Sequence, residues 1–275
     1  ISNKSTDSPL AIGVPGTIAG VFAVHEKLGS LPISEIMKPV IELAEKGVVV
    51  TKKQEKSLNV YRESIIKANG ATTKFASVFK ENDTIKYPAL AETLKRIARN
   101  GKDEFYKGET AQKLVDYFQK IGAIITKEDL AQYEAKWRNP LEFRYKNLKL
   151  ISMAPPSSGG ICLAQIMKMI EPFDLAKMGH NSPDAIQIIV EAERRAYADR
   201  SYFLGDPDFV KIPLKKLMNE EYLKQRMSNF NTEKATLSSE IKEGQVNYNE
   251  STETTHYSIV DSFGNAVAAT TTIND

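Results

Sequence analysis

The spacing of apolar residues changes near Trp137, and this change constrains the fold more than any other feature of the sequence. Before it, apolar residues recur three and four positions apart with Lys, Glu and Arg between them, which is typical of helices with one solvated face. After it, short runs alternate apolar and polar residues, as strands do. We therefore expect helices first, over residues 18–28, 34–46, 54–68, 89–99 and 110–120, and then strands over residues 141–145 and 148–153.

Local signals set the expected ends of these elements. Thr17 and Ser34 are placed to cap the first two helices, and glycines at positions 29 and 47 end them. Further along, a helix is expected over residues 161–170, and a second one starts at Ser182-Pro183 and runs to about residue 200. Residues 231–253 are polar and predict a long loop, followed by a hairpin with strands at 256–260 and 266–273.

Composition excludes several classes of function. The 275 residues carry 37 Lys and Arg against 35 Asp and Glu, and no local run supplies the basic face that nucleic-acid binding needs. No stretch reaches the roughly 18 continuous apolar residues of a membrane span. A single cysteine, Cys162, excludes an intrachain disulfide or a cysteine-based zinc cluster, and we expect it to be a buried apolar residue. Three scattered histidines make a metal site unexpected, and no cofactor is predicted.

A hydroxyl residue where the polar loop meets the final hairpin suggests a nucleophile. Cleavage of the bond before Thr254 would free its α-amino group, whose reference pKa of about 7.7–8.0 suits a general base at neutral pH. Such an amine can activate the otherwise weak threonine hydroxyl. On spacing alone, however, two threonines at the start of a strand are more often explained by β-propensity.

Four sequence blocks in the same order resemble the γ-glutamyltranspeptidase (glutathione hydrolase) family. They are residues 14–20 (VPGTIAG), 154–160 (APPSSGG), 191–201 (EAERRAYADRS) with 205–209 (GDPDF), and 254–268 (TTHYSIVDSFGNAVA). Together they span nearly the whole chain, which makes the resemblance far more specific than any one block.

The resemblance implies roles for four residues. Thr254 matches the catalytic threonine, and Glu253-Thr254 matches the bond that is cut autocatalytically between a large and a small subunit. Thr272 matches a threonine that supports the nucleophile, and Asn274 matches an asparagine that contacts the glutamyl group. The expected activity is γ-glutamyl transfer from glutathione and other γ-glutamyl compounds to water, amino acids or peptides.

The resemblance also implies an α+β fold of the N-terminal nucleophile hydrolase type, an αββα sandwich with a helix-rich N-terminal part. Residues 1–253 would belong to the large subunit and 254–275 to the first hairpin of the small subunit, whose remainder would be a partner. The family's carboxylate-binding arginine and oxyanion donors find no match here, so we expect this stretch alone to be an inactive part of a precursor. Bacterial members are periplasmic or secreted, which is the expected location.

Alternatives stay open on the same residues. The parent protein could be a related acylase, a poly-γ-glutamate depolymerase, or an unprocessed homologue without catalytic activity. Residues 155–160 could be mistaken for a phosphate-binding loop, but close approach of the backbone at a strand-to-helix turn is favoured. Asp199, Asp206 and Asp208 could suggest calcium, but pairing of Asp199 with Arg200 at a helix end and an Asp-Pro turn are favoured. His256 is expected to be structural.

Overall fold

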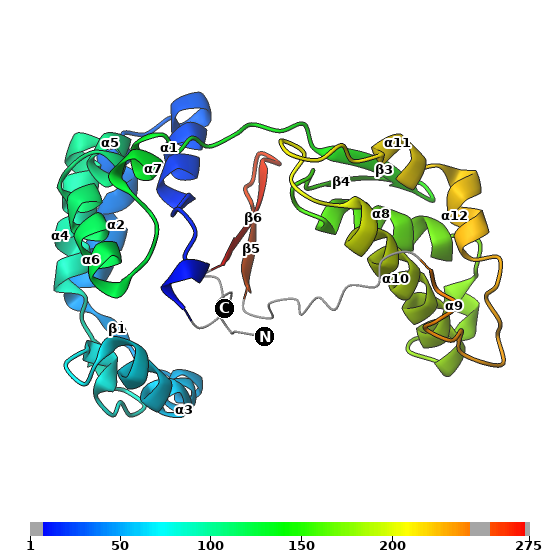
Figure 1. Ribbon diagram of the computed structural model, residues 1–275, viewed down its shortest axis with the longest axis horizontal. Coiled ribbons are helices and arrows are strands. Elements are labelled where there is room, and N and C mark those ends of the chain that lie inside the picture. The colour runs from blue at the N-terminus through cyan, green and yellow to red at the C-terminus, as the bar shows by residue number, and fades with distance from the viewer. Residues whose placement is uncertain (1–7, 243–253, 273–275) are drawn as a thin grey trace. The chain divides into compact units, whose positions relative to one another are not determined.

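The computed structural model describes residues 8–242 and 254–272, and in the second range it describes the side chains of residues 257–271. The chain forms two compact units (Figure 1). The first comprises Ile1–Lys136 and Ser251–Asp275, and the second comprises Trp137–Glu250. The boundary falls where the sequence changes from helical spacing to alternation.

The first unit is built mainly from helices. Its helices are α1 (Thr17–Leu28), α2 (Ile33–Lys46), α3 (Lys52–Asn69), α4 (Pro88–Asn100), α5 (Lys102–Tyr106), α6 (Glu109–Ile121) and α7 (Lys127–Ala131). Two-residue strands β1 (Val48–Val49) and β2 (Thr84–Ile85) form an antiparallel pair. The five helices expected in this region are all present, and glycines at positions 29 and 47 end α1 and α2 as predicted.

The predicted caps of the first two helices are wrong. Gly16 precedes α1 and Pro32 precedes α2, and neither helix has a side-chain cap of its own. Thr17 lies inside the first turn of α1, and Ser34 lies inside the first turn of α2. A cap from elsewhere in the fold replaces the local one in α1, which sequence spacing cannot reveal.

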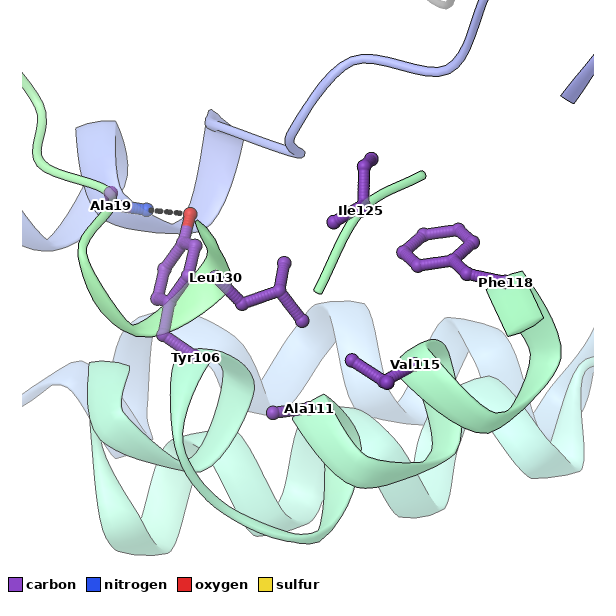
Figure 2. Close-up of a cluster of buried hydrophobic side chains, with 7 residues drawn as sticks. All are labelled: Ala19, Tyr106, Ala111, Val115, Phe118, Ile125 and Leu130. Carbon is purple, nitrogen blue, oxygen red and sulfur yellow. Dashed lines mark hydrogen bonds between the residues drawn. The ribbon is translucent and has the colours of Figure 1, made fainter. Parts of the chain in front are cut away.

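A cluster of buried side chains packs one part of the first unit (Figure 2). It joins α1 to α5, α6 and the segment around α7, through Ala19, Tyr106, Ala111, Val115, Phe118, Ile125 and Leu130. Figure 2 shows Tyr106 beside Ala19. The Tyr106 hydroxyl oxygen accepts a hydrogen bond from the Ala19 amide at 3.0 Å. The start of α1 is therefore fixed by a residue 87 positions later in the chain.

The second unit packs helices on a small hairpin. Strands β3 (Leu141–Tyr145) and β4 (Leu148–Ser152) pair antiparallel, as predicted, and α8 (Gly159–Ile170) packs against them and against α10 (Pro183–Phe203). Ser182 caps α10 by accepting a hydrogen bond from the Ala185 amide, which confirms the predicted start. Short helices α9 (Leu175–Met178), α11 (Leu214–Leu217) and α12 (Glu220–Arg226) complete the unit. Cys162 is buried, as predicted.

The last described element is the hairpin of β5 (Thr254–Val260) and β6 (Ala266–Thr272). The described residues thus contain three separate two-stranded sheets, and two stacked sheets of a sandwich are not seen in this part of the chain. Within residues 231–242 there is no helix or strand, as predicted, while residues 243–253 lie outside the described residues. None of the described helices is both long and apolar enough to cross a membrane.

Candidate functional site

The backbone register of the final hairpin brings two predicted site residues together. Thr254 is the first residue of β5 and lies directly opposite Thr272, the last residue of β6. Residues directly opposite in an antiparallel pair share one face of the sheet. Glu253 and Asn274 lie outside the described residues, as do the side chains of Thr254, Thr272 and His256. Their predicted roles remain predictions.

The turn that joins the two strands fixes this register. The Asp261 carboxylate accepts hydrogen bonds from the Phe263 amide, from the Asn265 amide and from the Asn265 side chain, all at 2.8–2.9 Å. The hydrogen bond from the Asn265 side chain is the largest cause that lowers the pKa of Asp261, which shows that the turn favours the ionised carboxylate. Gly264 adopts a φ of +83°, which favours glycine. The predicted Gly-Asn turn is confirmed.

A pocket of about 520 Å³ lies beside the hairpin within the first unit. It is lined by residues of α1, the start of α2 and both strands, namely Thr17, Gly20, Val21, Val24, His25, Leu28, Gly29, Ile33, Ile36, Tyr257, Val267, Ala269, Thr270 and Thr271. The lining is mostly apolar and contains no Lys or Arg. These residues therefore suit an apolar group and do not by themselves supply a site for an amino-acid carboxylate.

The block at residues 14–20 has a structural explanation. The Tyr106 hydroxyl donates a hydrogen bond to the Pro15 carbonyl at 2.7 Å and accepts one from the Ala19 amide. Tyr133 stacks on Tyr106 at 5.8 Å, and its ring lies so close to Gly16 that a side chain at this position would collide with it. The turn therefore requires glycine at position 16 because an aromatic ring occupies the space of a Cβ.

The block at residues 154–160 forms the turn from β4 into α8. A Cβ on Gly160 would collide with the Met153 carbonyl oxygen, so the predicted close approach of the backbone is confirmed. Arg200 on α10 fixes this turn from the side, because its Nε donates to the Ser158 hydroxyl at 2.8 Å. The block thus connects β4 to α8 through a close approach at Gly160, and Ser158 links it to α10.

The block at residues 191–201 forms a buried charged face of α10. Asp199 is only 2% exposed and lies about one turn before the end of α10. Its carboxylate accepts from Gln165 at 3.0 Å and from the Tyr222 hydroxyl at 2.8 Å, and it pairs with Arg226 at 3.2 Å. Both hydrogen bonds reach Oδ2, and the ion pair with Arg226 at Oδ1 offsets part of the cost of burying the charge.

A second part of this charged face was missed by the sequence reasoning. Glu191 and Arg195 are each 1% exposed and form an ion pair one helical turn apart. Burial alone would raise the pKa of Glu191, but hydrogen bonds from Arg195 and Thr236 outweigh it and hold the pKa below its usual value. The available signal was the spacing of Glu191, Arg195 and Asp199, four residues apart beside an apolar stripe, because such spacing puts charges on one helix face.

Asp206 and Asp208 lie in a turn that follows α10. The Asp206 side chain accepts from the Asp208 amide at 3.0 Å, which confirms the predicted Asp-Pro turn. Asp208 in turn accepts two hydrogen bonds from Arg138, at 3.2 and 2.9 Å. Within residues 8–242 and 254–272, no group of three or more His, Cys, Asp or Glu side chains is placed to hold a metal ion.

Comparison with known proteins gives a consistent result. The model of the gamma-glutamyltranspeptidase family matches residues 2–275. The glutathione hydrolase proenzyme of Escherichia coli K12 is 44% identical over 277 residues, covering 99% of this chain and 48% of that protein. The acylase ACY 1 proenzyme of Pseudomonas sp. SE83 is 32% identical, covering 96% of this chain and 47% of that protein. The chain therefore spans about half the length of the curated relatives it matches.

A solved structure extends this likeness to three dimensions. The gamma-glutamyltranspeptidase of Helicobacter pylori superposes with a TM-score of 0.84 at 39% identity, covering 92% of this chain and 73% of that one. The fold of the described residues is thus that of gamma-glutamyltranspeptidase structures. Both the family model and the solved structure lead to one conclusion: the chain belongs to the gamma-glutamyltranspeptidase family.

Proposed function

We propose that this chain is part of a precursor that cuts itself between Glu253 and Thr254 and then transfers γ-glutamyl groups. The observation that carries the proposal is the hairpin register, which puts Thr254 opposite Thr272 in a chain of this family. In this proposal residues 1–253 become the end of a large subunit and 254–275 begin a small one. The remainder of the small subunit completes the site and the αββα sandwich.

Self-cleavage follows from the chemistry of a hydroxyl beside a peptide bond. The Thr254 hydroxyl oxygen attacks the Glu253 carbonyl carbon, and the bond from that carbon to the Thr254 nitrogen breaks. The hydroxyl proton ends on the nitrogen, which becomes the free α-amine, and Glu253 is held as an ester. Water then cleaves the ester, which leaves a carboxylate on Glu253 and restores the hydroxyl of Thr254.

The new amine makes the same hydroxyl a catalyst. With a reference pKa of about 7.7–8.0, an α-amine can take the hydroxyl proton at neutral pH. The Thr254 oxygen then attacks the γ-carbonyl carbon of glutathione or another γ-glutamyl compound, and the amine returns the proton to the departing nitrogen. Water, an amino acid or a peptide next attacks the γ-glutamyl ester, which releases the product and regenerates the hydroxyl.

Two further residues have proposed roles in this reaction. Thr272 would donate or accept a hydrogen bond at the Thr254 hydroxyl, which is consistent with their positions directly opposite each other. Asn274 would contact the α-amino or carboxylate end of the glutamyl group. A periplasmic or secreted location is part of the proposal, since extracellular γ-glutamyl compounds would be the substrates.

An acylase is the second candidate. The specific observation in its favour is the similarity to the ACY 1 acylase proenzyme, which covers nearly the whole chain. An acylase would use the same threonine ester with a different acyl group. A γ-glutamyl anilide and an aliphatic or aromatic acyl anilide, offered to the same preparation, separate the two candidates.

The test uses the complete precursor and a Thr254→Ala variant. Intact mass spectrometry should find two fragments, with the break between residues 253 and 254, only in the protein that keeps Thr254. The processed protein should release anilide from the γ-glutamyl substrate. An uncut precursor would remove the base that the mechanism needs and would favour a non-catalytic homologue. Cleavage without γ-glutamyl release would favour the acylase.

A further inference from the structure

The helix α3 of the first unit packs on the protein with one side only. None of its 18 residues is buried, and in Figure 1 it lies beyond β1 at one end of this unit. On its inner side, Arg62 Nε donates to the Ala76 carbonyl oxygen at 2.5 Å, and Glu55 accepts a hydrogen bond from the Glu81 amide at 3.0 Å. These contacts hold α3 against the 3-10 helix η3 (Lys74–Ala76) and the chain that follows it.

The outer side of α3 carries a row of exposed residues. We call this row the α3 stripe and define it by Lys53, Lys56, Val60, Ser64 and Lys67. Each member follows the one before it by three or four positions, so all five lie along one side of the helix. Val60, in the middle of the row, is 64% exposed. At 1.5 Å per residue, the stripe is about 21 Å long.

The lysines of the α3 stripe are not neutralised by carboxylates. Among the described residues, none of the three forms an ion pair, although the exposed Glu63 borders the stripe on one side. Exposed lysines elsewhere in the unit do have such partners. Lys107 pairs with Asp103 at 3.2 Å, and Lys113 pairs with Glu109 at 2.6 Å. The α3 stripe therefore presents an uncompensated positive charge.

The charge of the surrounding sequence has the same sign. Residues 48–87, which include α3, carry eight Lys and Arg against four Asp and Glu, whereas the whole chain carries 37 against 35. The positive charge of the chain is thus concentrated in this segment, which favours an anionic partner. The stripe contains no arginine, whose planar fork recognises single phosphates or carboxylates, and lysines suit a diffuse field of negative charge better.

We propose that the α3 stripe binds the surface of an anionic lipid bilayer. Val60 favours a bilayer over a soluble polyanion, because an apolar side chain between lysines gains little from a hydrated chain of charges. At a bilayer it can enter the boundary between headgroups and acyl chains. Tyr61, 56% exposed beside the stripe, belongs to a residue type that is enriched at this depth. The aliphatic stems of the lysines let their ammonium groups stay among the headgroups.

The expected strength of binding follows from these contacts. Each lysine near an anionic surface strengthens binding about fivefold, and partial cover of Val60 adds about another fivefold. Together these factors give half-maximal binding at about 1 mM lipid. Binding should weaken with salt, because the Debye length falls from about 10 Å at 0.1 M to about 3 Å at 1 M ionic strength.

Sedimentation of the complete protein with lipid vesicles tests the proposal. The vesicles consist of phosphatidylcholine with roughly one-third phosphatidylglycerol, which supplies the negative charge. The triple variant Lys53→Gln, Lys56→Gln, Lys67→Gln should bind about 100-fold more weakly, as expected for three lost lysines. Val60→Ser should bind about fivefold more weakly, since it removes the apolar contact but no charge.

A second triple variant provides the matched control. Lys107→Gln, Lys113→Gln, Lys120→Gln makes the same change of net charge at exposed positions of the same unit. Its affinity for vesicles should stay within about twofold of the wild type, because the field of an exposed charge is screened over a Debye length. Lysine and glutamine have similar helix propensities, so circular dichroism should show the same helix content in both triple variants.

The outcomes separate a bilayer from other partners. We expect binding only when phosphatidylglycerol is present, with loss of binding at 1 M salt. Equal binding by the two triple variants, equal binding to pure phosphatidylcholine, or no binding by the wild type would each overturn the proposal. Polyphosphate serves as a soluble polyanion, and binding to it through the same lysines without binding to vesicles would also show that the bilayer is the wrong partner. Vesicle binding does not require Thr254, so this result is independent of the proposed function.

Discussion

Replacing Tyr106 by phenylalanine removes one hydroxyl group from the core of the first unit and leaves the ring in place. That hydroxyl accepts the Ala19 amide proton at 3.0 Å and donates to the Pro15 carbonyl oxygen at 2.7 Å. Ala19 is the third residue of α1, and its amide has no acceptor within the helix. Because Gly16 provides no side-chain cap, Tyr106 caps this helix from α5.

The magnitude follows from the burial of both residues. Ala19 and Tyr106 are each 2% exposed, so water cannot readily replace the lost acceptor. Leaving a buried donor unsatisfied costs about 1–3 kcal/mol, and loss of an N-cap costs about 1 kcal/mol. We take about 2 kcal/mol as the expected loss of local stability, which corresponds to about 30-fold faster opening of the first turn of α1.

Amide hydrogen exchange measured by mass spectrometry on a peptide that contains Ala19 tests this expectation in the complete protein. Tyr117→Phe is the matched control, because its hydroxyl is exposed and reaches only Asn69 at 3.4 Å. We expect a change of less than twofold in that control. Equal exchange at the start of α1 in the two variants would refute the reasoning that Tyr106 caps the helix.

Three other predictions concern Gly160, Glu191 and Thr272. Gly160→Ala should lower the free energy of unfolding by about 1–3 kcal/mol, because its Cβ would overlap the Met153 carbonyl oxygen. Gly159→Ala has no such overlap and should change the free energy of unfolding little. Urea titrations of the two variants measure the difference. Glu191 has a pKa below its ordinary 4.5, so it stabilises the fold above about pH 4.5 and loses this contribution as pH falls through the lowered pKa. The difference in unfolding free energy between wild type and Glu191→Gln should therefore shrink on acidification. Thr272→Val should slow γ-glutamyl anilide release about tenfold, measured in fully cleaved protein.

Much of the fold could be predicted because its signals are local. Helical spacing with a following glycine located α1 and α2, and Ser182-Pro183 located the start of α10. Alternation on both sides of a Gly-Asn turn predicted the final hairpin, and the length of that turn leads to the pairing of Thr254 with Thr272. The pairing of these two candidate site residues therefore follows from the sequence pattern of one short segment.

The remaining features depend on contacts between distant segments. No spacing near Thr17 indicates that a tyrosine in α5 caps the helix. Likewise, the sequence around Asp199 indicates only a residue near a helix end. The fold is needed to show that Gln165 and Tyr222 donate hydrogen bonds to its carboxylate. Charged residues on a helix are usually solvated, and only the hydrogen bonds from α10 to Asn229 and Thr236 show that this face is covered.

The pairing of Thr254 with Thr272 is the outermost rung of a two-stranded ribbon, at the end opposite its turn. A ribbon of two strands is at most marginally stable alone, and its open end is where fraying is greatest. Whatever neighbours pack on β5 and β6 therefore decide how much of the time this rung is formed. If Thr254 is the nucleophile, the rate of self-cleavage therefore measures how completely the surrounding fold has formed.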